Sequence, residues 1–192
     1  MGEIASGKST VARMMAEHGA VVANADEIGH RLLDDPAVKA DIVDVFGEDV
    51  VDSRGHISRQ ALARQVFSDP SDRENLAKLE GILHPRILDK VREYAKTTRS
   101  GGHPILVIDA PLLLEAGWVT LCHRVIYVSS PDSFRRRWAS ERGWSEEELL
   151  RREAAQLPLE LKRLRADLVV RNSGSLEDLR RQTVRLMALL VG

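Results

Sequence analysis

The stretch GEIASGKS at residues 2–9 decides the fold of this chain. It fits the pattern G-x-x-x-x-G-K-[ST], in which glycines let main-chain N–H groups curl around phosphate oxygens. The lysine of this pattern reaches the β- and γ-phosphates, and the hydroxyl that follows it can bind Mg²⁺. The nucleotide-binding residues that the stretch predicts, with the next helical residue added, are Gly2, Glu3, Ile4, Ala5, Ser6, Gly7, Lys8, Ser9 and Thr10.

A loop of this kind normally joins a buried strand to a helix. Only Met1 precedes the stretch, so we expect the strand to be missing or truncated at the N-terminus of the sequence. We therefore expect either that the true first residue of the protein lies before Met1 or that the chain has been shortened at its N-terminus.

Composition indicates one ordinary soluble domain. The 192 residues are 43% apolar and 30% charged, and the net charge of −1 gives no basic field for nucleic acid or membrane. Cys122 is the only cysteine, which suits a reducing compartment. The sequence has neither a signal peptide nor an apolar run of about 18 residues, so we expect a cytoplasmic protein.

Strands alternate with helices along most of the chain. Helices are expected at residues 8–17 and 176–190, and short apolar runs predict strands at residues 20–24, 104–109, 124–129 and 166–170. This alternation predicts a doubly wound parallel sheet covered by helices on both faces. Four strands can be counted, and the phosphate-binding loop requires a fifth.

The segment from residue 28 to 96 has a helical pattern throughout. Asp35 is expected to cap a helix that has Pro36 at its first position, and Ser58 to cap another. Asp69-Pro70 is expected to start a further helix, and Pro85 a long one. Residues 97–102 are expected to form a loop.

A second, smaller helical insertion follows the third visible strand. Ser130-Pro131 is expected to start one helix. Ser145 has capping-box spacing to Glu148 and starts a second helix, which ends before Pro158. We therefore expect one domain with a core at about residues 1–29, 103–130 and 158–192, a helical region at 30–102 and a lid at 131–157.

Two acidic residues follow strands at the edge where ligands bind in such sheets. Asp26 can accept the proton of an attacking hydroxyl, although it can also cap the helix that begins near Glu27. Asp109 ends the clearest strand, where the second acid of nucleotide-binding folds tends Mg²⁺.

The insertion after the third visible strand is rich in arginine, with six side chains interleaved with glutamates. Individually they are typical of a solvated face, whereas as a group they suit a lid that closes over a triphosphate. His84 is more typical of a structural histidine, and the apolar turn around Leu112 of packing. The arginines are Arg135, Arg136, Arg137, Arg142, Arg151 and Arg152.

Taken together, these features resemble the dephospho-coenzyme A kinase family over nearly the whole chain. The order and spacing of several short motifs carry this resemblance more specifically than the loop does. In chain order they are GEIASGKSTVA at residues 2–12, ADEIGH at 25–30, LHP at 83–85, DAPLLLE at 109–115, RG at 142–143 with Arg152 and Gln156, and AD at 166–167 with Asn172.

The resemblance implies a P-loop kinase of the nucleoside-monophosphate-kinase type, which transfers the ATP γ-phosphoryl group to the ribose 3′-hydroxyl of dephospho-coenzyme A. It implies that Lys8 binds phosphate, that Asp26 is the general base, that Arg142 is the lid arginine and that Asn172 lies near the adenine. The expected catalytic residues are therefore Lys8, Asp26 and Arg142, and Asn172 is expected to bind the nucleotide.

The same resemblance implies a substrate-binding set made of Asp26, His84, Asp109 and Leu112. Magnesium is the expected cofactor, bound by the Ser9 hydroxyl and by Asp109 through water. The expected partners are ATP and dephospho-coenzyme A, with no nucleic acid or membrane, in a monomer or weak oligomer.

The chain departs from the family in two places. The family usually has Asp-Ala-Asp where this chain has Asn24-Ala25-Asp26, so only the second acid is kept. Its loop usually reads Gly-Gly-Ile-Gly-Ser-Gly-Lys, so Glu3 and Ala5 replace glycines. Ala5 is expected to fit only with a negative φ, and Glu3 is expected to put an anion near the phosphates.

Two alternatives stay open at this point. The chain can be another P-loop kinase acting on a small molecule or nucleotide, or a nucleotide-binding protein that catalyses weakly because its first strand is missing. A GTPase is disfavoured because no Asn-Lys-x-Asp motif is present, and an ABC-type ATPase because no Leu-Ser-Gly-Gly-Gln-like motif is present.

Overall fold

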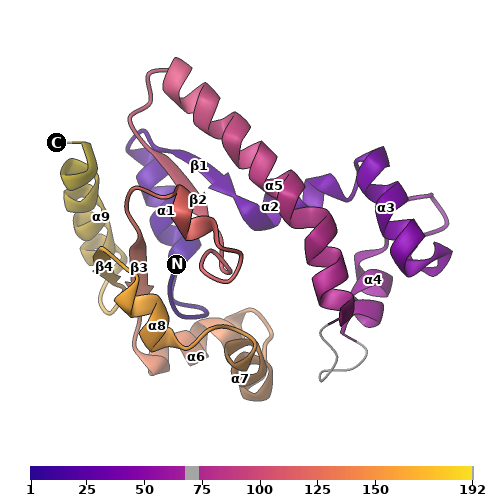
Figure 1. The fold of residues 1–192 in the computed structure, drawn as a ribbon. Helices are drawn as coiled ribbons and strands as arrows, with labels where there is room; N and C mark the ends of the chain where they lie inside the picture. The colour runs from indigo at the N-terminus through magenta and orange to yellow at the C-terminus, as the bar shows by residue number, and fades with distance from the viewer. Residues whose placement is uncertain (68–73, 192) are drawn as a thin grey trace. The chain divides into compact units, whose positions relative to one another are not determined.

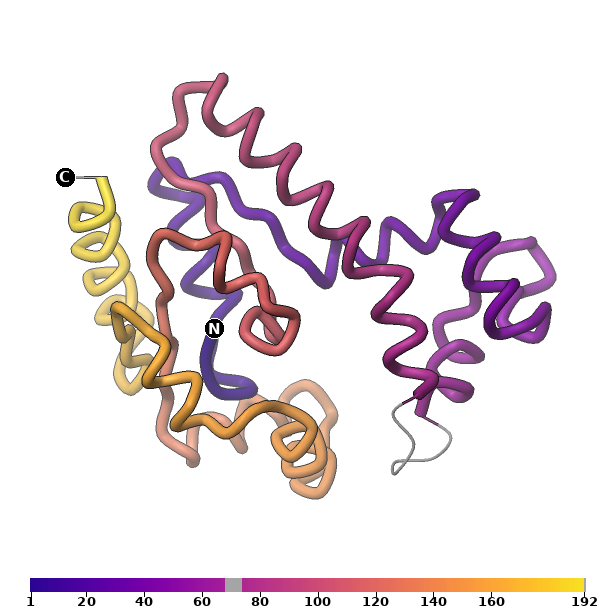
Figure 2. Tube along the Cα trace, in the orientation of Figure 1, coloured from indigo at the N-terminus to yellow at the C-terminus, as the bar shows by residue number. Residues whose placement is uncertain are grey.

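The structure is a computed structural model that describes residues 1–67 and 74–191. It divides into two compact units, each described here by itself. The first unit comprises Met1–Ala23 and Thr97–Gly192, and the second comprises Asn24–Lys96. Figures 1 and 2 show the course of the chain through both units.

Strands in the first unit form two hydrogen-bonded pairs. β1 (Val21–Asn24) pairs with β2 (Leu106–Asp109), and β3 (Ile126–Ser129) pairs in parallel with β4 (Leu168–Arg171). All four predicted strands are therefore confirmed, each shorter than its apolar run, and the parallel register of β3 and β4 agrees with the expected α/β architecture.

The start of the chain runs alongside β3. The Met1 amino group donates to the Ile126 carbonyl at 2.8 Å, and the Val128 N–H donates to the Met1 carbonyl at 2.9 Å. Gly2 continues this contact as a parallel bridge to Val128. The phosphate-binding loop therefore begins alongside β3 and is not an isolated surface turn.

Two helices cover the sheet of the first unit (Figure 1). α1 (Lys8–Glu17) packs against α9 (Leu176–Val191) and β2, and α9 packs against β4. The two helices share a buried cluster with side chains of β3 and β4. Full burial of a Leu or Met side chain stabilises a fold by roughly 1.5–3 kcal/mol, so this cluster anchors the helix that carries the loop. Its buried members are Val11, Met14, Met15, Ala20, Val128, Val170, Leu179, Leu186 and Met187.

The predicted insertion after β3 is also present. α6 (Asp132–Glu141) follows Pro131, and α7 (Glu146–Ala154) is capped by Ser145, whose hydroxyl accepts the Glu148 N–H at 3.1 Å. The predicted cap at Ser145 is therefore confirmed, whereas the Glu148 carboxylate pairs with Arg151 and Arg152. The structure adds two short helices that the sequence did not reveal, α8 (Leu159–Leu164) and the 3₁₀ helix η2 (Trp118–Leu121).

The second unit is largely helical. Two of its helices begin at predicted caps: Asp35 caps α3 (Pro36–Phe46), and Ser58 caps α4 (Arg59–Val66). Asn24, which was not predicted as a cap, caps α2 (Ala25–Leu32). The cap of α2 is Asn24, so Asp26 does not have the capping role. The helical pattern is broken by η1 (Glu48–Val50) and by an antiparallel bridge from Val51 to Ile57.

Helix α5 (Glu74–Ser100) corrects two predictions. Pro85 lies inside it and does not open a helix. An internal proline costs about 3 kcal/mol, and the packing of Ile87 and Val91, both buried, offsets this cost. Residues 97–100 are helical and not a loop, because Thr98 is buried. The helix ends at Ser100, and Gly102, with φ at 72°, lies in the turn that follows.

The predicted helix start at Asp69-Pro70 lies outside the described residues. Within the described parts of the chain, no helix combines the length and the apolar character needed to cross a membrane.

Candidate active site

The loop at residues 2–7 delivers the chain to the N-terminus of α1. Gly7 is the N-cap, with φ at 89° and no side chain that could cap the first amides of the helix. Those N–H groups have no partner within a helix, and they carry the positive end of its dipole. The arrangement therefore provides main-chain donors for phosphate oxygens, as the motif predicts.

Glycine is required at both ends of the loop because other atoms approach closely. A Cβ on Gly2 would lie 2.1 Å from the Val128 carbonyl oxygen, and one on Gly7 would lie 2.5 Å from the Asn172 Nδ2. Both glycines also have positive φ, 148° and 89°. The two glycines that the pattern demands are thus fixed by packing as well as by conformation.

Ala5 overturns the expectation of a negative φ. Its φ is 57°, in the left-handed region that alanine enters at a cost of roughly 1–2 kcal/mol. The residue is buried, and it packs with Ile4 against Ala139 and Leu149 of the following helices. Burial of the Ala5 methyl group offsets part of the conformational cost, which a glycine at this position would not have.

Lys8 lies folded back onto the loop. Its Nζ donates to the main-chain carbonyls of Glu3 at 2.6 Å and Gly2 at 3.4 Å. The pKa of Lys8 is lowered from 10.5 to about 8. Burial is the largest cause, the charges of Lys162 and Arg142 also lower the pKa, and the charge of Asp109 opposes them. These charged groups therefore lie within electrostatic reach of the lysine.

Asp109 ends β2 and is buried, as expected for an acid at the ligand-binding edge of the sheet. The two predicted hydroxyl residues begin α1: Ser9 is exposed and Thr10 is partly buried. Ser6 is fully buried, and its Oγ has no hydrogen-bond partner among the residues that the structure describes.

Asn172 supports the loop directly. Its Nδ2 donates to the Ser6 carbonyl at 3.0 Å, and its own carbonyl accepts from the Ser130 hydroxyl at 2.7 Å. The buried amide thus holds the turn before Gly7 in place. No sequence pattern signalled this contact, because it joins residues 166 positions apart.

The Glu3 carboxylate has hydrogen-bond partners at the end of β3. Its Oε2 accepts the Ser130 N–H at 2.7 Å, and its Oε1 accepts the Tyr127 hydroxyl at 3.3 Å. Burial, and then the Glu3 charge, raise the pKa of Tyr127 to about 12. The carboxylate is therefore held by the end of β3, and the expectation that Glu3 puts an anion near the phosphates stays a prediction.

The predicted lid carries Arg142 at the end of α6, exposed to solvent. Trp144 follows it, and the guanidinium carbons of Arg142 and Arg152 lie 5.8 and 4.3 Å from the centroid of a Trp144 ring. These contacts are in the range of cation–π attraction. The indole therefore gathers two of the six arginines to one place.

The other lid arginines have ordinary ion-pair partners. Arg136 pairs with Glu146 and Arg137 with Glu141, both at exposed positions, and Arg151 pairs with Glu148. The solvated-face interpretation is confirmed for these three. Arg135 differs, because it is buried.

Sequence reasoning missed a buried ion pair. Lys162 of α8 is fully buried, and its Nζ lies 2.7 Å from Glu115 Oε1 and 2.7 Å from Gln156 Oε1. Glu115 also accepts the Leu157 N–H at 3.0 Å. Burial alone would raise the pKa of Glu115, but these partners lower it overall. Because Lys162 also binds Gln156 and Glu115 also binds Leu157, this pair holds the segment that connects α7 and α8.

Two predicted site residues lie in the second unit. Asp26 is exposed in the first turn of α2, and His84 is partly buried in α5. Leu112 belongs to the first unit, in the partly buried turn after β2. The loop, Asp109, Arg142 and Asn172 belong to that unit too, and Asp26 and His84 do not.

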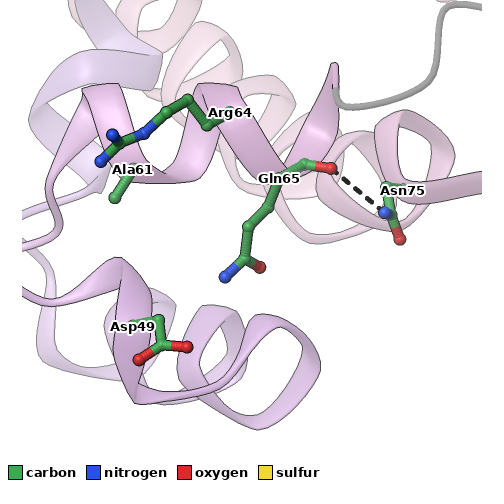
Figure 3. Close-up of a pocket in the computed structure, with 5 residues that line it drawn as sticks. All are labelled: Asp49, Ala61, Arg64, Gln65 and Asn75. Atoms are coloured by element: carbon green, nitrogen blue, oxygen red, sulfur yellow. Dashed lines mark hydrogen bonds between the residues drawn. The ribbon is translucent and has the colours of Figure 1, made fainter.

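The second unit also contains an open cavity of about 420 Å³ between α4 and η1. Figure 3 shows its lining, in which the Asn75 amide donates to the Gln65 carbonyl at 3.2 Å. None of the predicted site residues lines it. The lining residues are Asp49, Ala61, Arg64, Gln65 and Asn75.

A glycine-framed loop, a lysine and a helix N-terminus beside an acid-ended strand define a P-loop nucleotide-binding protein. A family model described as dephospho-CoA kinase matches residues 1–178. The chain belongs to the dephospho-CoA kinase family. It is a kinase of coenzyme A biosynthesis, which phosphorylates dephospho-CoA at the expense of ATP.

Relatives of similar length support this membership. The chain is 38% identical to a dephospho-CoA kinase of Carboxydothermus hydrogenoformans, over 97% of this chain and 90% of the relative. It is 39% identical to one of Thermus thermophilus, over 100% and 90%.

Solved structures agree. A Thermus thermophilus protein, TT1252, has a TM-score of 0.83 at 38% identity, covering 100% of this chain and 95% of the other. The dephospho-CoA kinase from Campylobacter jejuni has a TM-score of 0.72 at 26% identity, covering 99% and 94%. The P-loop fold class predicted from the sequence is therefore confirmed, and the alternative functions are not favoured.

Proposed function

We propose that this site transfers the γ-phosphoryl group of ATP to the ribose 3′-hydroxyl of dephospho-CoA, with Lys8, Asp26 and Arg142 as the catalytic residues. The observation that supports this most is the placement of Lys8. Its amino group lies on the loop carbonyls, has a lowered pKa and is within electrostatic reach of Asp109 and Arg142. A γ-phosphate in the loop would give this cation a stronger partner than a carbonyl.

Phosphoryl transfer runs mainly on positioning and charge stabilisation. The loop amides and the N-terminus of α1 bind the phosphate oxygens, while Lys8 and Arg142 stabilise the charge that develops on the transferred group. Arg142 would reach the phosphates from the lid, which comprises about residues 131–157. Closure of that lid would exclude the water that competes with the acceptor hydroxyl.

The donor set suits magnesium. The Ser9 hydroxyl and the Asp109 carboxylate are hard oxygen ligands, and Mg²⁺ keeps several waters and takes only one or two protein groups. Within residues 1–67 and 74–191, no cluster of three or more His, Cys, Asp or Glu side chains could hold a metal, which fits such sparse ligation. Bound Mg²⁺ would neutralise charge on the β- and γ-phosphates.

Asp26 is the proposed base for the acceptor hydroxyl. It is an exposed carboxylate in the first turn of α2, and the capping of that helix is done by Asn24. Its carboxylate can therefore serve the substrate without loss of the helix start. His84 and Leu112, with Asp26 and Asp109, are the proposed contacts to dephospho-CoA, and Asn172 is the proposed neighbour of the adenine. The helical region at about residues 30–102 would hold this substrate.

We further propose that the enzyme works in the cytoplasm as a monomer or weak oligomer, with no nucleic-acid or membrane partner. The net charge of −1 and the lone Cys122 support this.

The experiment is a coupled ADP-release assay with ATP, Mg²⁺ and dephospho-CoA, on wild type, Asp26→Asn and the exposed control Asp34→Asn. Asp26→Asn is expected to lose most turnover while it keeps its ATP affinity, and Asp34→Asn to match wild type. Weakened ATP binding with near-normal turnover in Asp26→Asn would refute the role as a base. Absence of ADP release from folded wild-type protein would refute the reaction itself.

A further inference from the structure

The Glu3 side chain joins the phosphate-binding loop to the lid. Its carboxylate is held by the Tyr127 hydroxyl and by the Ser130 N–H, where β3 gives way to α6. The side chain is 16% exposed, so water screens these contacts only partly. A charge in the second position of the loop is thus fixed at the first hinge of the lid.

Arg135 extends this link into both lid helices. Its side chain is 9% exposed; it pairs with Asp132 in the first turn of α6 and with Glu153 of α7. Its Nε lies 3.7 Å from Glu3 Oε2, beyond hydrogen-bond distance. That Nε is buried, and it has no hydrogen-bond partner among the described residues. A small approach of the two groups would satisfy this donor.

Apolar contacts run parallel to the charged ones. Two loop side chains enter a small core with the lid helices, so the loop cannot shift without moving its neighbours. The residues of this shared core are Ile4, Ala5, Ala139 and Leu149, with Trp138 and Trp144 packed against them.

Glu3 also contacts the phosphate-binding lysine through its main chain. Its carbonyl accepts Lys8 Nζ at 2.6 Å, while its carboxylate faces Arg135. A phosphate that draws Lys8 away would release this carbonyl and free the backbone of Glu3 to move. The same residue would then carry that movement to the lid.

We propose that Glu3 is a positioning residue that couples phosphate binding at the loop to the position of the lid through Arg135. The proposal rests on the phosphate-binding role of the loop and adds a connection that the reaction itself does not require. When phosphate engages Lys8, Glu3 Oε2 and Arg135 Nε approach and form the missing hydrogen bond. This bond draws α6 and α7, and with them Arg142, onto the loop.

The test measures binding of a non-hydrolysable ATP analogue with Mg²⁺ to the full chain, without turnover. Glu3→Gln keeps an acceptor for the Ser130 N–H but loses the charge, and Arg135→Lys keeps the charge but loses Nε. Coupling of this kind predicts about five- to tenfold weaker binding for each variant, and no further loss in the double variant. The control Arg137→Gln lies on the same helix in an exposed pair with Glu141, and is expected to change binding less than about twofold.

A second measurement reports on the lid directly. Hydrogen exchange of residues 133–150 is expected to slow on addition of the analogue in wild type and in Arg137→Gln, but not in Glu3→Gln. The proposal would be overturned if the loss of binding in the double variant equalled the product of the losses in Glu3→Gln and Arg135→Lys. It would also be overturned if the lid of Glu3→Gln were protected from exchange as in wild type. Circular dichroism and urea unfolding check that each variant folds, and if Glu3→Gln does not, Arg135→Lys carries both measurements.

The variant Lys8→Ala distinguishes a failure of the proposed phosphate site from a failure of the proposed coupling. If Lys8→Ala binds the analogue as wild type does, the loop is not the phosphate site and the coupling falls with it. If Lys8→Ala loses binding while Glu3→Gln behaves as wild type, only the coupling is overturned.

Discussion

The Nζ of Lys8 lies 2.6 Å from the main-chain carbonyl of Glu3, a residue five positions earlier in the same loop. A lysine in this position is partly buried and has two carbonyls as partners, which are weaker partners for a cation than phosphate oxygens. We therefore expect that binding of a nucleotide would exchange these carbonyls for phosphate oxygens around Lys8.

The lowered pKa of Lys8 predicts a pH-dependent affinity for ATP. Below pH 8 the lysine is charged before and after binding, so affinity is constant. Above pH 8 the lysine loses its proton and has to regain one to hold phosphate, so affinity is expected to fall by up to about tenfold per pH unit. Calorimetry in buffers of different ionisation enthalpy would show proton uptake at pH 9 and none at pH 7. Lys8→Arg, which keeps its proton, is the control, and equal proton uptake in that variant would contradict the assignment.

The conformation of Ala5 predicts only a small net change in stability when it is replaced by glycine. Ala5→Gly relieves a left-handed alanine at φ 57°, worth roughly 1–2 kcal/mol. It also gives the unfolded chain more freedom, at about 0.4–1 kcal/mol, and loses a buried methyl group. The free energy of unfolding in urea is therefore expected to change by less than about 1 kcal/mol.

Gly7→Ala provides the opposite case in the same loop. Its φ is 89°, and the added Cβ would meet Asn172 Nδ2 at 2.5 Å. This variant is expected to lose about 2 kcal/mol or more of stability, together with nucleotide binding. Equal effects at positions 5 and 7 would show that left-handed backbone, and not the approach of Asn172, governs the loop.

Local sequence signals predicted the elements that depend on local chemistry. Asp35, Ser58 and Ser145 cap helices as their spacing indicated. Three strands lie inside their apolar runs, and β4 extends one residue beyond its run, to Arg171. The failures arise where distant packing overrides local preference. Helix α5 continues past Pro85 because buried side chains beyond the proline keep the helix in place.

The site shows the same division. The motif identified Lys8 and the two glycines, because their role follows from spacing alone. The contacts of Asn172 with Ser6, and of Lys162 with Glu115, join segments far apart in the sequence, so no pattern announces them. The partners of the Glu3 carboxylate were not predicted for the same reason, since Tyr127 and Ser130 lie more than 120 residues away.

The buried pair of Lys162 and Glu115 predicts a large loss of stability when one partner is removed. Lys162→Met leaves the Glu115 carboxylate with only the Leu157 N–H, and is expected to cost about 3 kcal/mol in urea unfolding. Loss of the exposed pair in Arg137→Gln should cost less than about 1 kcal/mol. A loss in Lys162→Met no larger than in Arg137→Gln would show that the buried lysine is not held by its charge.

The geometry around Trp144 predicts a kinetic role for Arg142 that its neighbour Arg151 lacks. Arg142 lies 5.8 Å from the Trp144 ring, and Trp144 packs against the core that Ile4 and Ala5 of the loop share with the lid helices. Arg142→Ala is expected to lower kcat by about 100-fold or more while the ATP affinity changes little, because its charge acts on the transferred phosphoryl group. Arg151→Ala removes an equally exposed arginine whose partner is Glu148, and is expected to leave kcat within about twofold of wild type. Steady-state kinetics with both substrates varied would separate the two, and a raised KM for ATP with unchanged kcat in Arg142→Ala would assign this arginine to nucleotide binding instead of the transition state.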